Sequence, residues 1–251
     1  MRTDKQWIKW GSSDPYYAVT SDKKHFLSEF TEDGKQEFFR SGENRIEYLL
    51  GMISDIYNVS GFKSALDFGS GVGRLVIPLA RNADRVVGVD ISTAMIAEAE
   101  KNCERFGISN ATFFESDDAI SRVHDRFDLV DSQVVLQHIP WSRGRKIVER
   151  LGDMVNQDGV IAIQFLSRCN APWFIRLLVR LRYQIPPIQW IRNLAHGHRV
   201  FLPPMEVHAY PLGEVLHILD DKGFGKYVLM TDRTTVRDFD SVTLLAIRGQ
   251  G

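Results

Sequence analysis

The residues best suited to chemistry lie in two short segments. Asp67-Phe68-Gly69-Ser70-Gly71-Val72-Gly73 is a carboxylate followed by glycine at every second position, and the strand-like Val86–Val89 leads into the carboxylate Asp90. Such glycines expose backbone N–H groups at the start of a helix, where polar or anionic parts of a ligand can approach. A carboxylate after the next strand is placed to accept hydrogen bonds from ribose hydroxyls. The two segments predict a nucleoside-cofactor site rather than a turn that binds nothing.

The spacing of the glycines argues against a dinucleotide cofactor. The dinucleotide motif G-x-G-x-x-G needs glycine three residues after Gly71, where this chain has Arg74. Asp67 would also repel a pyrophosphate, whereas a cofactor with an amino group and a sulfonium would tolerate it. At these residues the chain resembles the class I S-adenosylmethionine-dependent methyltransferases, whose first motif is E/D-x-G-x-G-x-G. The resemblance implies S-adenosyl-L-methionine as cofactor, S-adenosyl-L-homocysteine as product, and cofactor contacts at Asp67, Gly69, Ser70, Gly71 and Gly73.

Hydrophobic periodicity predicts strands that alternate with helices. Strands are expected before the glycine segment and at 86–89, 111–115, 127–131, 160–166, 226–231 and 242–248, and helices at 43–58, 75–81, 93–106, 142–156 and 212–222. Alternation of this kind implies a parallel sheet with helices on both faces. The last two strands have no helix between them and should form an antiparallel hairpin. The expected fold is α/β, a Rossmann-like three-layer sandwich whose seven-stranded, mostly parallel sheet has an antiparallel last strand, with a helical lid.

Polar residues that follow the other strands complete the predicted cofactor site. Asp90 is expected to bind the ribose, with Ile91 and Met95 against the adenine, although Met95 suits the core equally well. Ser92 or Thr93 suits the role of N-cap of the following helix. The resemblance implies an aspartate at the adenine amino group after the third strand. Asp117 fits that role better than Asp118, which would contribute backbone contacts, and a solvated loop is the alternative.

The segment from Phe127 to Pro140 resembles the fourth strand and following loop of small-molecule methyltransferases. That resemblance places Ser132 and Gln133 beneath the methionine half of the cofactor, with the acceptor beyond. The [N/D]-P-P-[Y/F] motif of amino-methyltransferases is missing, which favours oxygen over nitrogen as the acceptor atom. His138 is the histidine closest to the predicted reaction centre, and an imidazole can remove a proton from a hydroxyl or an amine. Packing or capping beside Pro140 is the alternative role.

Two segments outside the regular pattern are expected to form a substrate lid. They are the aromatic residues 1–42 and the insertion 167–211, and the core comprises 43–166 and 212–251. Between Asp158 and Glu206 the chain has no acidic residue but contains six arginines. The insertion therefore fits an anionic acceptor, a membrane surface, or an amphipathic helix pair whose arginines are solvated or paired. Tyr17, His208 and Tyr210 are second-rank substrate candidates, and His196, His198 and His208 lack a further ligand, so no metal is expected.

Composition limits the class of protein. The chain has 251 residues, a net charge of −1 and two cysteines, Cys103 and Cys169. The balanced charge argues against a dedicated nucleic-acid partner, and two cysteines provide no disulfide framework. We expect a cytoplasmic monomer or homodimer that acts on a small molecule. The alternatives are RNA or protein methylation on the same fold, a non-catalytic cofactor-binding module, and a nicotinamide enzyme on a similar sheet.

Overall fold

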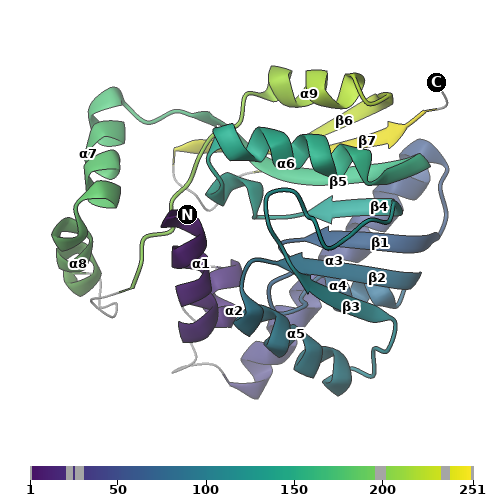
Figure 1. Cartoon of the computed structure of the whole chain (residues 1–251), viewed down its shortest axis with the longest axis horizontal. Helices are drawn as coiled ribbons and strands as arrows, with labels where there is room; N and C mark the ends of the chain where they lie inside the picture. Colours follow the sequence, from purple (N-terminus) through teal and green to yellow (C-terminus); the bar gives the residue numbers. More distant parts are fainter. Residues whose placement is uncertain (1, 21–24, 26–30, 196–201, 233–237, 250–251) are drawn as a thin grey trace.

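The computed structural model describes residues 2–20, 25, 31–195, 202–232 and 238–249, and its centre is a seven-stranded sheet (Figure 1). The strands lie in the order β3-β2-β1-β4-β5-β7-β6. Strands β1 to β5 run parallel, and β7 lies antiparallel between β5 and β6. Their bounds are β1 Phe62–Phe68, β2 Ala83–Asp90, β3 Ala111–Glu115, β4 Phe127–Ser132, β5 Val155–Cys169, β6 Phe224–Asp232 and β7 Phe239–Arg248. The predicted Rossmann-like sheet with an antiparallel last strand is confirmed.

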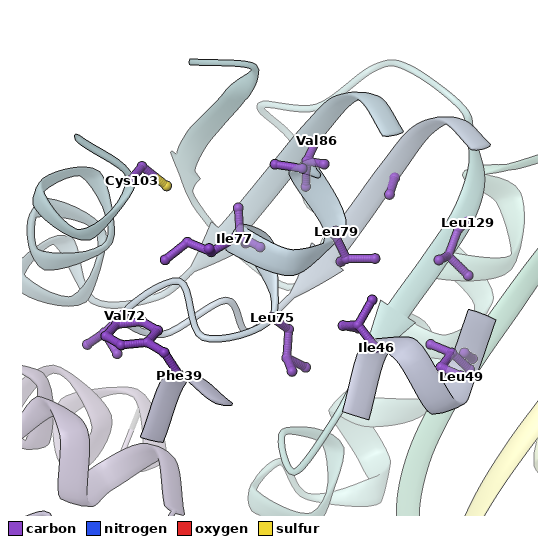
Figure 2. Close-up of a cluster of buried hydrophobic side chains, with 14 of the residues drawn as sticks. Phe39, Ile46, Leu49, Val72, Leu75, Ile77, Leu79, Val86, Cys103 and Leu129 are labelled. Carbon is purple, nitrogen blue, oxygen red and sulfur yellow. The ribbon is translucent and has the colours of Figure 1, made fainter. Parts of the chain in front are cut away.

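Helices cover both faces of the sheet. The helices are α1 Arg2–Ser13, α2 Pro15–Thr20, α3 Glu32–Tyr57, α4 Val76–Ala80, α5 Thr93–Arg105, α6 Trp141–Asp153, α7 Trp173–Gln184, α8 Pro186–Ala195 and α9 Leu212–Asp220. Neighbouring strand residues point to opposite faces, so Ala65 packs with α3 and α4, while Leu66 packs with α6 and α9. Figure 2 shows the first of these clusters, with Ile46 of α3 and Leu79 of α4 labelled. The result is a three-layer sandwich.

Helix α3 begins eleven residues before the predicted start at residue 43. Thr31 is its N-cap, and the Thr31 side chain accepts a hydrogen bond from the Gly34 N–H at 3.1 Å. The predicted helix start at residue 43 was wrong because Gly42 serves a close contact within the helix rather than marking its beginning. A Cβ atom at Gly42 would lie 2.3 Å from the backbone oxygen of Arg74, directly after the glycine segment. Gly42 therefore lets α3 approach the backbone that follows the glycine segment.

The N-terminal aromatic residues pack into the core rather than forming a tail. Tyr16, Phe38 and Phe39 are buried in the same cluster as α4. The Tyr16 hydroxyl donates to Glu98 at 2.7 Å and to Asn102 at 3.1 Å, and both partners lie on α5. Helices α1 and α2 are thereby held beside α5, at the edge of the sheet where the cofactor site was predicted.

The insertion forms a helical hairpin that stands away from the sheet (Figure 1). Pro186 begins α8 rather than simply ending α7, in keeping with the preference of proline for the first turn of a helix. Helix α7 has no buried residue. Within the described part of the chain, no helix combines the length and the apolar character needed to cross a membrane.

Candidate functional site

A cleft lies at the carboxyl ends of β1, β2 and β4. This is the edge at which open α/β sheets bind ligands. Nine of the residues proposed from the sequence line it: Gly69, Gly71, Asp90, Ile91, Met95, Asp117, Asp118, Gln133 and His138. The other seven, Asp67, Ser70, Gly73, Ser132, Tyr17, His208 and Tyr210, do not line this cleft.

The glycine segment lies directly under the cleft with a backbone that only glycine adopts readily. Gly69, Gly71 and Gly73 have φ angles of +82°, +52° and +84°. A Cβ atom at Gly69 would lie 2.2 Å from a methyl of Val135, and one at Gly71 would lie 2.9 Å from a methyl of Val19. The valine side chains that approach Gly69 and Gly71 therefore leave no space for a side chain at either position.

Asp90 is held at the rim of the cleft by the loops on either side. Its carboxylate accepts hydrogen bonds from the Gly71 N–H at 2.9 Å and the Ser92 N–H at 2.8 Å. Burial raises the pKa of Asp90, and the backbone N–H donors oppose that rise. Ser92 is the N-cap of α5, as predicted, and its hydroxyl accepts from the Met95 N–H at 3.4 Å. Asp90 thus faces the cleft with a fixed orientation and with acceptor capacity left for a ligand.

Beneath the glycine segment lies a buried carboxylate pair that the sequence did not reveal. Asp67 on β1 and Asp131 on β4 are register partners, 2% and 0% exposed. Burial, and then the neighbouring Asp131 carboxylate, raise the pKa of Asp67 well above its ordinary value. Burial also raises the pKa of Asp131 to about 6, although Arg45 and Arg74 oppose the rise. Arg74, which occupies the place of the third dinucleotide glycine, thus supplies a positive charge that partly offsets the burial of the pair.

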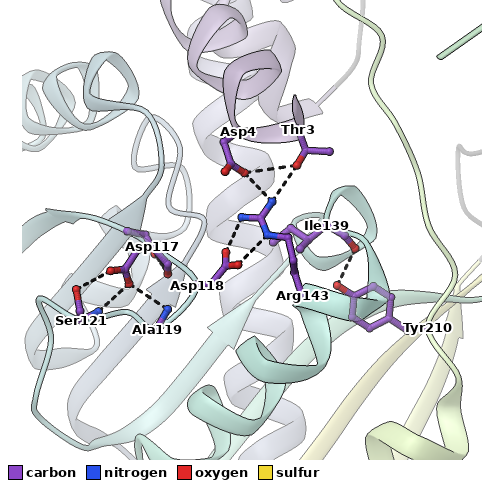
Figure 3. A network of polar contacts seen from close by, with 10 residues as sticks. Thr3, Asp4, Asp117, Asp118, Ala119, Ser121, Ile139, Arg143 and Tyr210 are labelled. Atoms are coloured by element: carbon purple, nitrogen blue, oxygen red, sulfur yellow. Dashed lines mark hydrogen bonds and ion pairs between the residues drawn. The ribbon is translucent and has the colours of Figure 1, made fainter. Parts of the chain in front are cut away.

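The two aspartates after β3 have different partners (Figure 3). The Asp117 carboxylate accepts from the backbone N–H groups of Ala119 at 3.0 Å and Ser121 at 2.9 Å, and from the Ser121 hydroxyl at 2.6 Å. The hydrogen bonds from Ser121 lower the pKa of Asp117. The Asp118 carboxylate instead accepts two hydrogen bonds from Arg143, at 2.8 and 2.5 Å. Asp117 therefore shapes the loop, and Asp118 fixes that loop to α6.

Arg143 also connects the cleft to the N-terminal helix. It donates to Asp4 at 2.8 Å and to the Thr3 hydroxyl at 3.0 Å (Figure 3). The hydrogen bonds to Asp118, and then those to Asp4, raise the pKa of Arg143. Helix α1 thereby becomes a wall of the cleft, to which Thr3, Asp4 and Trp7 contribute. Thr3 and Asp4 are too far from Arg143 in the sequence for any motif spacing to predict these contacts. The aromatic residues of segment 1–42 did indicate that this segment packs over another part of the protein.

His138 lies on a short 3-10 turn after β4 and is 7% exposed. Its Nδ1 lies 2.7 Å from the Glu206 carbonyl oxygen, and its Nε2 lies 3.2 Å from the Gln137 amide nitrogen. Because a carbonyl only accepts, Nδ1 carries the proton and Nε2 has the lone pair. Burial lowers the pKa of His138 to about 4, while the Glu206 carbonyl opposes this effect. The imidazole is therefore a neutral, oriented acceptor that lines the cleft.

Comparison with known proteins gives a family match for the part of the chain around this cleft. Residues 65–159 match a family described as "Methyltransferase domain", and solved methyltransferases share the fold. Over these residues the chain is a methyltransferase domain. The magnesium protoporphyrin IX methyltransferase from Synechocystis, solved with bound SAH, superposes with a TM-score of 0.62 at 22% identity, covering 98% of this chain and 99% of that chain.

Curated relatives of the methyltransferase domain differ in their acceptors. A 23S rRNA (uracil(1939)-C(5))-methyltransferase of Aeromonas hydrophila is 44% identical over 95 residues, which are 33% of this chain and 22% of that protein. A ubiquinone biosynthesis O-methyltransferase of Azorhizobium caulinodans is 25% identical over 173 residues, 66% of each chain. The chain spans about a fifth of the length of the rRNA enzymes that it matches.

The depressed pKa of His138 predicts a loss of stability in acid. The unfolded chain binds this proton near pH 6.5, whereas the folded methyltransferase domain resists it down to pH about 4. The neutral His138 therefore contributes about 3 kcal/mol to the free energy of unfolding. This contribution is complete above pH 6.5 and is lost as the pH falls toward 4. Urea unfolding at pH 7.5, 6.0 and 4.5 should show a weaker pH dependence for His138→Gln than for the unmodified protein. His124→Gln, at an exposed position, should leave the slope unchanged; equal slopes for all three proteins would contradict the assignment.

The other sequence candidates lie around the cleft rather than in it. The Ser132 hydroxyl donates to the Phe68 carbonyl at 3.0 Å, and the buried Tyr210 hydroxyl donates to the Ile139 carbonyl at 3.0 Å. Tyr17 packs beside Trp10, with ring centroids 5.4 Å apart. His208 lines a second cavity, between α7 and the sheet.

The structure also bears on the histidines considered as metal ligands. His208 lies near Glu206, but His196 and His198 fall outside the described residues. Among the residues that the structure describes, no group of three or more His, Cys, Asp or Glu side chains is arranged to hold a metal ion.

Proposed function

We propose that this protein transfers the methyl group of S-adenosylmethionine to a small-molecule acceptor, with oxygen favoured over nitrogen as the acceptor atom. The observation that carries the proposal is a single cleft that joins the glycine segment and Asp90 to His138. Class I relatives supply the reaction type, and a ubiquinone biosynthesis O-methyltransferase is among them.

The residues of the cleft fit the parts of this cofactor. Asp90 would accept the ribose hydroxyls, and Ile91 and Met95 offer an apolar surface for the adenine. Gly69 and Gly71 line the cleft without side chains and so leave room for the chain that bears the amino acid. Asp131 below the loop, with a pKa of about 6, is ionised above that pH and favours a cationic cofactor over a pyrophosphate. When bound, the cofactor supplies a methyl group already activated by its sulfonium.

This chain's own contribution is alignment and proton removal. Displacement at a methyl carbon needs an acceptor held in line and shielded from water. Trp7 packs on His138 with ring centroids 4.7 Å apart, so α1 covers the imidazole. Nε2 of His138 accepts from the Gln137 amide in this structure, and its lone pair would receive the proton of an acceptor hydroxyl that takes the place of that amide. Helix α1 and the insertion 167–211 are the proposed lid around the acceptor.

Ligand titration tests the cofactor assignment. In calorimetry the protein should bind S-adenosylhomocysteine and show no tight binding of NAD. Binding of NAD without binding of S-adenosylhomocysteine would replace the proposal with a nicotinamide enzyme. Binding of neither ligand would indicate a protein that keeps the fold but no longer binds a nucleoside cofactor.

Replacement of His138 tests its role as the base. His138→Gln should lower turnover of a hydroxyl acceptor by roughly 10²- to 10⁴-fold, with affinity for S-adenosylhomocysteine nearly unchanged. The acceptor is found first, by transfer of labelled methyl to a panel of phenols and hydroxy acids. Gln137→Ala, which removes the side-chain partner of Nε2, is the matched control for disturbance of the turn. Near-normal turnover of His138→Gln would leave the histidine a packing role.

An RNA acceptor is the second candidate, and the 44% identity to an rRNA methyltransferase over 95 residues favours it. The net charge of −1 speaks against it, because RNA binding needs a basic surface. Incubation with labelled S-adenosylmethionine and either total RNA or the small-molecule panel separates the two. Label in RNA alone would overturn the small-molecule proposal while leaving the cofactor assignment intact.

A further inference from the structure

The hairpin of α7 and α8 exposes most of the large apolar side chains that the described surface contains. Of fourteen such exposed side chains, ten lie between residues 173 and 194: Trp173, Phe174, Leu177, Leu178, Leu181, Ile185, Ile188, Trp190, Ile191 and Leu194. Trp173 and Ile191 are each 70% exposed. A contiguous apolar surface of this kind marks a site of interaction.

The exposed apolar side chains of α7 lie on one face of that helix. On α7, Trp173, Leu177 and Leu181 recur at intervals of four, so they lie on one side of the helix. The opposite side carries Ile175 and Val179, which line the cavity between α7 and the sheet. The apolar face therefore points away from the protein, consistent with the separation of the hairpin from the sheet (Figure 1).

The charge of the hairpin is of one sign. It contains Arg176, Arg180, Arg182 and Arg192, and the chain has no Asp or Glu from residue 159 to residue 205. Arg176 and Arg180 are exposed, and they lie between the apolar face of α7 and the cavity, whose rim they also line. Apolar and aromatic side chains flanked by arginines are the composition of helices that lie in the interface of an anionic bilayer.

We infer that the α7–α8 hairpin docks on the surface of an anionic lipid bilayer, lying in the headgroup region. Arginines would meet lipid phosphates while the apolar face enters the acyl boundary. Charge complementarity favours this occupant over a second copy of the chain. A symmetric pair of hairpins would bring arginines against arginines with no carboxylate from the hairpin to neutralise them. The inference is independent of the proposed methyl transfer.

Flotation of the full chain with vesicles tests the inference. The protein should float with vesicles of phosphatidylcholine and phosphatidylglycerol at 3:1, bind pure phosphatidylcholine much more weakly, and dissociate as salt rises. Arg176→Gln with Arg180→Gln should weaken binding roughly 30-fold, and Leu178→Ser with Ile191→Ser by at least roughly tenfold. The controls are Ile56→Ser and Leu229→Ser, which remove apolar side chains of 43% exposure elsewhere on the surface, and these should bind like the unmodified chain.

The readouts separate the inference from its competitors. Titration with S-adenosylhomocysteine checks that each variant keeps its folded core, and unchanged affinity makes a loss of flotation specific to the hairpin. Equal binding to neutral and anionic vesicles, or an equal loss in the two controls, would overturn the inference. So would a dimer in solution that Leu178→Ser and Ile191→Ser dissociate while no vesicle is bound, because the face would then belong to a second copy.

Discussion

Replacing Asp90 with alanine should weaken the binding of S-adenosylhomocysteine by roughly 100-fold or more. The carboxylate is the group proposed to accept the ribose hydroxyls, and each charge-assisted hydrogen bond contributes roughly 1.5–3 kcal/mol. Its orientation is already fixed by the Gly71 and Ser92 N–H groups, so little ordering is required when the ligand binds. Calorimetric titration measures the change.

Two further variants isolate the effect of the Asp90 carboxylate. Asp90→Asn keeps the shape and should lose less affinity than Asp90→Ala, because an amide oxygen still accepts. Asp125→Ala removes a carboxylate at the surface, where Asp125 pairs with Arg85 at 2.7 Å, and should bind the ligand normally. Thermal unfolding of Asp90→Ala checks that the two loops remain in place. Affinity within a few-fold of normal for Asp90→Ala would remove Asp90 from the site.

Adding one methyl group at Gly144 should destabilise the protein by about 3 kcal/mol, at the upper end of the cost of overpacking. A Cβ atom there would lie 1.8 Å from the hydroxyl oxygen of Tyr210. Tyr210 cannot retreat easily, because its ring is fully buried against Trp141 and Phe165 and its hydroxyl donates to Ile139. Chemical unfolding of Gly144→Ala measures the loss.

Gly51→Ala is the matched control, since Gly51 is also a helical glycine. A Cβ atom at Gly51 meets nothing within 4 Å. Alanine favours a helix over glycine by about 1 kcal/mol, so this variant should be slightly more stable than the unmodified protein. Opposite signs for the two substitutions are expected, and a similar effect of both would contradict the packing described around Tyr210.

The sheet and its glycine segment could be predicted because their signals are local. Strand 111–115 agrees with β3 to the residue, and Ser92 is the predicted N-cap, because period and capping depend on neighbours in sequence. Asp90 and Gly71 were identified as site residues in the same way, because each follows the end of a predicted strand. Such signals place a residue at the edge of the sheet but do not say what its side chain contacts there.

Contacts between residues far apart in the sequence could not be predicted, because no local pattern encodes them. Asp131 was read as part of a buried strand, and only the pairing of β1 with β4 places it beside Asp67. Tyr210 was a second-rank substrate candidate, yet burial against aromatic rings keeps it out of the cleft. Nothing in the sequence indicated that Arg143 matters, because its partners lie on two distant segments, the loop after β3 and helix α1.

The Arg143 bridge has a consequence for the order in which the protein is completed during synthesis. Asp4 and Arg143 are 139 residues apart in the chain. At the usual rates of translation, helix α1 emerges roughly 7 to 28 seconds before Arg143. Until then α1 cannot take its bridged position, although the glycine segment and Asp90 have already been made. One wall of the cleft, built from the first residues described, is therefore among the last parts of the site to be fixed.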